Sequence, residues 1–298
     1  MTTRDAVLAS LTSVIWGLAF VAVKFGLQSF SAPELTAVRF LLACLPALVI
    51  PRPRLPWWSI VVIGLTLFTG QFLLLFFAYT RGLPPGLASV TQQTQAFFTV
   101  LLAAAFLHDV PSPRQWLGMA IAFAGLALIG STVGSDFSAA GLALGLGGAL
   151  SWAVGNVLVK RAVAVPIFPL VVWASLIPPV PSLIVSVVSD RRVPVVHALA
   201  HASWPSIIAA LYLGVFATVI AYAIWGDLLQ RYPTAVVAPF ALLAPCTGVV
   251  ASAVIFGEMF GPARYAGMAL ILAGLAVVIR APAAGTGTSP AAMRARSP

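Results

Sequence analysis

The chain has 298 residues, of which 61% are hydrophobic and only 8% are charged, and its mean hydropathy is +1.04. Soluble domains carry roughly 25% charged residues, so the composition excludes a soluble fold and indicates an integral membrane protein. The formal net charge of +9 does not indicate a nucleic-acid partner. Its basic residues are scattered at the ends of apolar segments, which is how membrane topology is encoded, and we expect a lipid bilayer and no nucleic acid around the chain.

Ten apolar segments follow one another between prolines, glycines and charged residues. Each has about the 17 to 25 residues that a helix needs to cross a bilayer at 1.5 Å per residue. They are 6–28, 34–50, 57–80, 86–107, 114–132, 139–161, 168–188, 205–229, 234–256 and 263–280. The sequence therefore predicts an all-α polytopic membrane protein with ten transmembrane helices.

The basic residues also predict the orientation of the chain. Most of them fall on one side of the membrane if the N-terminus is cytoplasmic, although Arg191 and Arg192 fall on the other. Because cytoplasmic loops carry an excess of Lys and Arg, we expect both termini in the cytoplasm. Residues 281–298, rich in Gly, Ser and Pro, predict a disordered cytoplasmic tail.

The chain repeats itself. Residues 115–129 and 264–278 align without a gap, and a shift of 149 residues also carries Gly118 to Gly267 and Gly125 to Gly274. A shift of 136 carries the Trp16–Lys24 pair to Trp152–Lys160. We expect a first repeat at 1–133 and a second at 134–280. Five spans per repeat is an odd number, so the repeats must be inverted about an axis in the membrane plane. The repeated glycines are expected to serve helix packing.

A polar cluster, Thr91 to Gln95, lies well inside the fourth segment. Gln92 and Gln95 share one helical face at i,i+3 spacing. Amides both donate and accept hydrogen bonds without carrying charge, so they suit a neutral or zwitterionic ligand. The alternative is hydrogen bonding between helices.

The equivalent stretch of the ninth segment contains Pro239 and Pro245. Each proline frees a backbone carbonyl, which is tolerated at membrane depth only where it faces protein or a watery cavity. We expect a central cavity here, with bending at 86–95 and 239–245 and hinges at Gly86, Pro239 and Pro245. Kinks that face lipid without a function are the alternative.

Aromatic residues complete the predicted site. Trp16 and Trp152 are equivalent in the two halves and lie about ten residues, roughly 15 Å, inside their segments. An indole suits an amphipathic ligand, although core packing would also bury it. The predicted substrate-binding residues are Trp16, Phe20, Tyr79, Gln92, Gln95, Phe98, Trp152, Asn156, Tyr222 and Trp225.

The charged residues are placed mostly at segment ends. Lys24 is expected to anchor its span at the interface, Arg39 to have a structural or interfacial role near Glu34, and Asp227 to pair with Arg231 at i,i+4. No carboxylate lies near the middle of a segment. We therefore expect facilitated diffusion or exchange rather than tight proton antiport.

Catalytic and metal sites are not indicated. His197 and His201 are four residues apart but lack a third ligand, and no nucleophile with its base or cluster of acids occurs. We expect no metal, no cofactor and no enzymatic activity, and a membrane-embedded enzyme remains a distant alternative.

The residues that close the spans resemble a known family. Trp16-Gly17 with Lys24, the echo at Trp152–Lys160, and Phe256-Gly257-Glu258 leading into 267–274 look like the drug/metabolite transporter superfamily, EamA type, and most like the YddG-type amino-acid exporters. One departure is that Leu107-His108-Asp109 stands where the first half would carry Phe-Gly-Glu.

The resemblance implies a central cavity surrounded by spans 1, 3, 4, 6, 8 and 9. It also implies export of aromatic, hydrophobic and other neutral amino acids across the bacterial inner membrane by alternating access, with no partner protein required. Drugs, nucleobases or other small metabolites are the alternative substrates, since fold alone does not determine the substrate.

Overall fold

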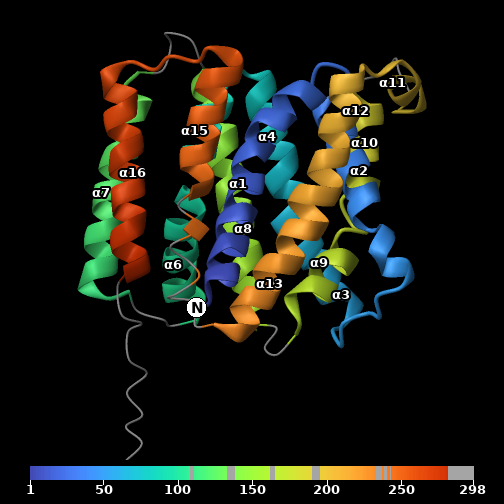
Figure 1. Ribbon diagram of the computed structural model, residues 1–298, viewed down its shortest axis with the longest axis horizontal. Coiled ribbons are helices and arrows are strands. Elements are labelled where there is room, and N and C mark those ends of the chain that lie inside the picture. Colours follow the sequence, from blue (N-terminus) through green and yellow to red (C-terminus); the bar gives the residue numbers. More distant parts are fainter. Residues whose placement is uncertain are drawn as a thin grey trace, which may run out of the picture.

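The computed structural model describes residues 1–107, 111–132, 138–161, 165–189, 195–232, 237, 240–241 and 243–280. Within these residues every regular element is a helix, and the long helices run side by side between two ends of the molecule (Figure 1). The prediction of an all-helical chain is confirmed for this part. Asp109, Pro239 and the predicted tail lie outside the described residues.

Except for α11 (Val195–His201), which lies between two expected segments, the helices follow the expected apolar segments. Those of the first half are α1 (Thr3–Gly26), α2 (Ala32–Ala43), the 3-10 helix η1 (Leu45–Leu48), α3 (Trp57–Ile63), the π-helical segment η2 (Gly64–Gly70), α4 (Gln71–Thr80), α5 (Pro85–Thr91), α6 (Thr94–Leu107) and α7 (Pro113–Gly130). Those of the second half are α8 (Ala139–Arg161), α9 (Ile167–Ala174), α10 (Pro179–Ser189), α11 (Val195–His201), α12 (Trp204–Leu211), the π-helical segment η3 (Tyr212–Ile220), α13 (Ala221–Arg231), α15 (Leu243–Phe256) and α16 (Pro262–Arg280).

Five helical stretches in the described residues are long and apolar enough to cross a membrane. They are Thr3–Gly26, Trp57–Thr80, Ala139–Val159, Ile167–Val188 and Trp204–Leu228. Shorter apolar helices cover Pro113–Ile129, Leu243–Phe256 and Pro262–Val277. Helix α2 is shorter than its predicted segment because Pro46 lacks an N–H and cannot continue the α-helix.

The outer surface of the molecule is unusually apolar, and some small polar side chains are buried inside it. Small polar side chains such as Ser13, Thr36 and Ser89 are fully buried, whereas Val187 and Val254 are 72% and 79% exposed. Large exposed apolar side chains are the informative exception in a soluble protein. Here they form the outer surface that lipid would cover.

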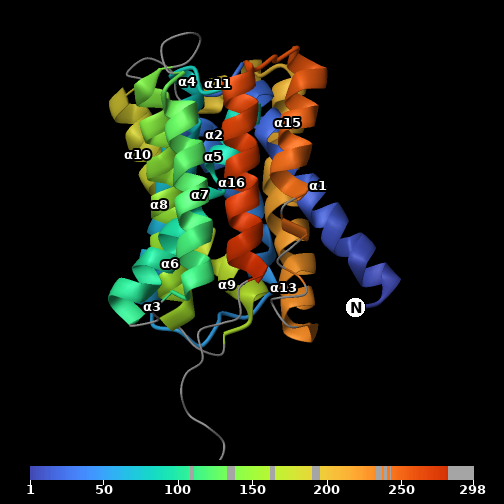
Figure 2. The same ribbon diagram turned by 90° about the vertical axis from the view of Figure 1, so that its left-hand side faces the viewer.

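Helices α7 and α16 form a closely packed pair at one edge of the molecule (Figures 1 and 2). A Cβ added at Gly125 would lie 2.5 Å from the carbonyl oxygen of Gly267, and one at Gly267 would lie 2.7 Å from that of Gly125. Only hydrogen fits at both positions, because the two backbones are in contact. The repeated glycines thus serve helix packing.

Each half of the chain places its first helix against the other half. Helix α1 packs on α12, η3, α13 and α15, whereas α8 packs on η2, α4 and α6. The Ser206 hydroxyl donates to the carbonyl of Phe25 over 2.8 Å, which fixes the end of α1 at the start of α12. The Ser138 hydroxyl donates to the carbonyl of Arg81 over 2.7 Å, which fixes the start of α8 at the end of α4.

The two π-helical segments occupy matching positions, 149 residues apart. In η2 the Thr69 hydroxyl donates to the carbonyl of Gly64 over 3.2 Å, and in η3 the Thr218 hydroxyl donates to that of Leu213 over 2.8 Å. Both bonds span five residues, and π-helical turns are frequent at functional sites. Both segments lie beside the cavity described below.

Candidate functional site

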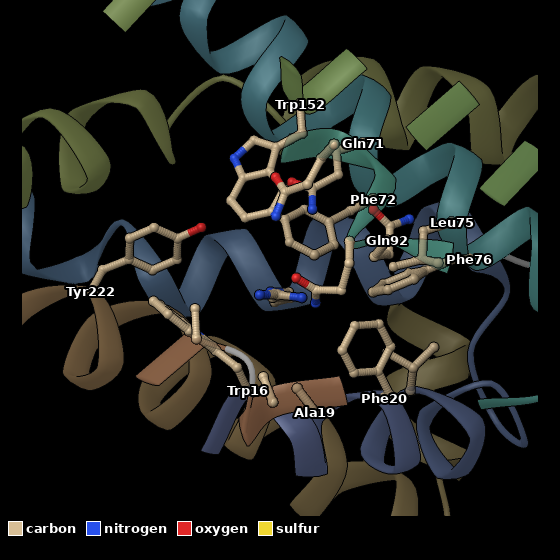
Figure 3. Close-up of a pocket in the computed structure, with 16 residues that line it drawn as sticks. Trp16, Ala19, Phe20, Gln71, Phe72, Leu75, Phe76, Gln92, Trp152 and Tyr222 are labelled. Atoms are coloured by element: carbon tan, nitrogen blue, oxygen red, sulfur yellow. The ribbon is translucent and has the colours of Figure 1, made fainter. Parts of the chain in front are cut away.

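A central cavity of about 120 Å³ lies between the helices of both halves. Its lining residues are Trp16, Ala19, Phe20, Val23, Arg39, Gln71, Phe72, Leu75, Phe76, Gln92, Gln93, Gln95, Trp152, Tyr222, Ala241 and Ala244. Figure 3 shows Trp16 and Phe20 on one side, Trp152 and Gln71 on the other, and the Tyr222 hydroxyl directed toward the space between them.

Six of the ten sequence-predicted binding residues line this cavity. They are Trp16, Phe20, Gln92, Gln95, Trp152 and Tyr222. They come from α1, the turn between α5 and α6, α6, α8 and α13. The topology therefore brings together residues that lie up to about two hundred positions apart in the sequence.

Two further predicted residues lie behind the cavity wall. The Tyr79 hydroxyl donates to the carbonyl of Phe20 over 3.0 Å, and Tyr79 lines a second cavity instead. The Trp225 ring packs edge-on against Trp16 with a centroid distance of 5.2 Å. Both residues therefore support cavity residues and do not line the cavity themselves.

Phe98 and Asn156 are directed away from the cavity. The Phe98 ring packs against Phe123 of α7 with a centroid distance of 6.4 Å. The Asn156 amide donates to the Thr99 hydroxyl of α6 over 3.4 Å. Phe98 lies one helical turn beyond Gln95, and Asn156 lies one turn beyond Trp152, each on the same face as that lining residue. Position along the helix therefore separates them from the cavity.

The amide side chains lie where the helix of the fourth segment is interrupted. Helix α5 ends at Thr91 and α6 begins at Thr94, so Gln92 and Gln93 form a turn. The Gln92 amide nitrogen donates to the carbonyl of Gly145 in α8 over 3.3 Å. The side-chain oxygens of Gln71, Gln92 and Gln95 are buried without a hydrogen-bond partner in the described part of the chain.

The predicted hinge residues are held in place by neighbouring helices. The Gly86 N–H donates to the Ser252 hydroxyl over 3.2 Å and to Glu258 Oε2 over 3.3 Å. Pro245 is buried in α15, and its carbonyl accepts from the Ser89 hydroxyl over 3.3 Å. The interruption itself lies at 92–93, inside the stretch where bending is predicted, and the hinges stay a prediction.

Arg39 lines the cavity, although its sequence position predicted a structural or interfacial role. It is 4% exposed and lines the central cavity from α2, a segment outside the implied set of six. Its Nε donates to the Thr218 hydroxyl over 3.1 Å, and its guanidinium carbon lies 3.9 Å from the centre of the Phe72 ring. The expected neighbour Glu34 instead accepts from the backbone N–H of Ser31 and caps α2.

Two other missed lining residues, Gln71 and Phe76, sit in a nearly continuous apolar run on α4. Gln71 is the one polar side chain between 70 and 78, which is a usable signal. For Phe76 the uniformly apolar sequence gives no indication of which helix face meets the cavity.

A second cavity of about 510 Å³ lies beyond Tyr79. At its wall the Lys24 Nζ pairs with Glu258 Oε1 over 3.2 Å and lies 4.1 Å from the centre of the Phe256 ring. Glu258 also accepts a hydrogen bond from Ser252. The expected interfacial anchoring of Lys24 stays a prediction, and the structure adds a carboxylate partner for it on the loop after α15.

An ionic cluster joins α1 and α13 at the opposite end of the molecule. Arg231 pairs with Asp227 over 2.6 Å, which confirms the predicted i,i+4 pair, and with Asp5 over 2.9 Å. The Tyr232 hydroxyl donates to Asp5 Oδ2 over 2.7 Å. Hydrogen bonds to Asp5 and Asp227 raise the pKa of Arg231 above its usual range, so Arg231 stays charged at physiological pH.

Comparison with known proteins identifies the family. Residues 4–131 and 139–280 both match the EamA-like transporter family. An Escherichia coli (strain K12) protein named "Probable amino-acid metabolite efflux pump" is 36% identical over 92% of this chain and 94% of its own length. A Salmonella typhimurium protein of the same name is 38% identical with the same coverage.

A solved structure shares the fold over the full length of both chains, with a TM-score of 0.65 and 19% identity. This likeness shows the fold alone. The family match covers nearly the whole chain, including every helix that contributes to the central cavity. The chain therefore belongs to the EamA-like transporter family of the drug/metabolite transporter superfamily, and it is a membrane transporter rather than an enzyme.

Proposed function

We propose that this transporter exports amino acids, including aromatic, hydrophobic and other neutral ones, through its central cavity. The observation that carries the proposal is the lining itself, which combines amides, one guanidinium and aromatic rings between the two halves. Such a mixture suits a small ligand with a polar head and an apolar side chain. The names of the Escherichia coli and Salmonella relatives support the same substrate class.

The proposed architecture is ten transmembrane helices in two inverted five-helix repeats, 1–133 and 134–280. The matching π-helical segments η2 and η3 and the exchange of α1 and α8 between the halves support it. The basic residues support a cytoplasmic location for both termini. Residues 281–298 would form a disordered tail, and the membrane would be a bacterial inner membrane. The Asp5–Arg231 end would then face the cytoplasm.

Alternating access is the proposed mechanism. Tyr79 and the Lys24–Glu258 pair lie toward the second cavity, and the Asp5–Arg231 cluster joins helices at the opposite end. Opening one end while the other stays closed would expose the central cavity to one side at a time. Bending of the interrupted fourth span near Gly86 and of the ninth near Pro239 and Pro245 would accompany the change.

Substrate counterflow in proteoliposomes tests the proposal. Purified protein is reconstituted with unlabelled L-serine, L-leucine or L-phenylalanine inside, and uptake of the same labelled amino acid is measured. We expect counterflow with at least one of them, and its loss in Trp16→Ala, Gln95→Ala and Trp152→Ala.

The matched control is Trp173→Phe, because the Trp173 indole donates to the carbonyl of Ile50 over 2.9 Å and lies outside the cavity lining. Dyes and nucleobases are tested in parallel. Counterflow of these compounds without any amino acid would overturn the proposed substrate class.

A further inference from the structure

We propose that the central cavity recognises the zwitterionic head of an α-amino acid at two separate places. Arg39 would bind the carboxylate, and the amide oxygens of Gln71, Gln92 and Gln95 would bind the ammonium group. The inference rests on the proposed function and deepens it, because it states which chemical groups a substrate must carry.

The carboxylate site follows from the surroundings of Arg39. Its one side-chain hydrogen bond runs from Nε to Thr218, which leaves both terminal nitrogens without a hydrogen-bond partner among the described residues. No carboxylate of these residues lies within ion-pair distance of it. A buried charge at membrane depth normally pairs with another group. The ring of Phe72 compensates the charge only in part.

A guanidinium with two free terminal nitrogens matches a carboxylate geometrically. Its planar fork donates two parallel hydrogen bonds, which are stronger than neutral ones. The Thr218 hydroxyl accepts from Nε at one edge of the guanidinium, and the Phe72 ring covers one of its faces. The edge formed by the two terminal nitrogens is therefore available to a ligand. A ligand carboxylate would therefore supply the counter-charge that the chain lacks at this place.

The ammonium site follows from unsatisfied acceptors. The side-chain oxygens of Gln71, Gln92 and Gln95 have no partner in the described residues although they are buried. The Gln92 amide nitrogen is engaged with the carbonyl of Gly145, which leaves its oxygen as the free atom. A buried acceptor without a donor has given up its hydrogen bonds to water without compensation. An ammonium group, with three donors and no acceptor, complements these oxygens.

The two sites together select against molecules that carry only one of the two groups. A carboxylic acid would satisfy Arg39 and leave the amide oxygens unpaired, whereas an amine or amide would leave the guanidinium unpaired. The aromatic rings of Trp16, Phe20 and Trp152 would contact the side chain of the substrate. These apolar contacts would discriminate between substrates less strongly than the contacts with the charged head. The charged head would therefore determine the substrate class, and the rings the preference within it.

The test is competition in the counterflow assay with matched analogues. The exchanged amino acids are L-serine, L-leucine and L-phenylalanine. For each of them the competitors are the amino acid itself, its carboxamide, which lacks the carboxylate, and the des-amino acid, which is the same carboxylic acid without the amino group. In the wild type we expect the carboxamide to compete at least about tenfold more weakly than the amino acid. The des-amino acid is expected to compete several-fold more weakly.

In Arg39→Gln we expect amino acid and carboxamide to compete equally strongly. In Arg39→Lys we expect the difference between their competition strengths to be smaller than in the wild type. In Gln92→Leu the penalty for the missing amino group should shrink while that for the missing carboxylate stays. The matched control is Arg264→Gln, because Arg264 is also buried and also donates to a threonine, Thr132, over 2.9 Å, but lies outside the cavity.

Equal competition by carboxamide and amino acid in the wild type would overturn the inference, even if Arg39→Gln failed to fold. So would an Arg39→Gln protein that folds and still discriminates between the two as the wild type does. Either result, with amino-acid counterflow intact, leaves the proposed function standing. Absence of counterflow for all three amino acids would instead overturn the proposed function and this inference together.

Discussion

At the scale of residues, the two equivalent tryptophans of the halves have different surroundings. The Trp16 indole donates to the carbonyl of Ala217 in η3 over 3.0 Å and packs edge-on against Tyr222 and Trp225. Trp152 lines the same cavity but makes no side-chain hydrogen bond in the described part of the chain. One indole therefore connects two helices, whereas the other has its N–H available for a ligand.

This difference predicts different outcomes for the same substitution. Trp16→Phe should lower the free energy of unfolding by about 1 kcal/mol, the net contribution of one hydrogen bond. Trp152→Phe should lower stability less and weaken counterflow, because Trp152 packs beside the core but its indole makes no hydrogen bond in the described part of the chain. Thermal unfolding in detergent and counterflow on the same preparations measure both effects. Equal loss of stability in the two variants would contradict the assignment.

At the scale of elements, α1 is fastened at both of its ends. Asp5 near its start pairs with Arg231 of α13, and Lys24 near its end pairs with Glu258 after α15. Four residues between these points, Trp16, Ala19, Phe20 and Val23, line the central cavity. Breaking one of these ion pairs would free one end of α1 while the other ion pair still holds the opposite end. Helix α1 can therefore couple the opening of one end of the cavity to the closing of the other.

We predict that breaking each pair moves the accessibility of the cavity in opposite directions. Glu258→Gln should increase labelling of an Ala19→Cys protein by an impermeant maleimide added from the second-cavity side, and Asp5→Asn should decrease it. The Lys24–Glu258 pair is partly exposed and is worth about 1 kcal/mol or less, so changes of a few-fold are expected.

The labelling is performed with Cys44 and Cys246 replaced by serine, because both native thiols are unpaired. The Ala19→Cys protein with both ion pairs intact gives the reference rate. Changes of the same sign in the two variants would show that the pairs do not act as opposing gates.

At the scale of the whole molecule, the described residues that line the central cavity include one permanent cation and no carboxylate or histidine. Carboxylates that carry protons through transporters lie on the substrate or ion pathway. The described acidic residues Asp5 and Glu258 are instead engaged in ion pairs at the two ends. The described lining thus offers no carboxylate or histidine for which substrate and proton would compete.

We therefore predict that amino-acid counterflow persists when the proton gradient is collapsed. An ionophore that equalises pH across the proteoliposome should leave the rate unchanged, because no group in the lining has to change its protonation state. A matched preparation without ionophore serves as control. Strict dependence of transport on an imposed pH gradient would contradict facilitated diffusion or exchange.

Much of the fold could be predicted from the sequence because it is encoded locally. Apolar length gives the helices, and the repeated glycines give the packing of α7 on α16. The polar cluster of the fourth segment and the paired tryptophans likewise indicated the cavity region, since polar and amphipathic side chains deep in a span need a partner.

The rest of the site depends on contacts between distant segments. Arg39 reaches the cavity because α2 packs against η3 and α4, and Lys24 meets a carboxylate 234 residues away. Phe98 and Asn156 lie one helical turn beyond the lining residues Gln95 and Trp152 and contact neighbouring helices instead. Within a uniformly apolar span, helical periodicity is too weak to determine which face meets the centre.

The sequence by itself thus determined that the chain is a helical membrane protein with an internal repeat, because hydropathy and register are properties of successive residues. Only the tertiary structure decided which side chains share the central cavity and which close its ends. Whether the buried Arg39 and the three amide oxygens can bind a ligand depends on the side chains that surround them, and these come from helices that are far apart in the chain.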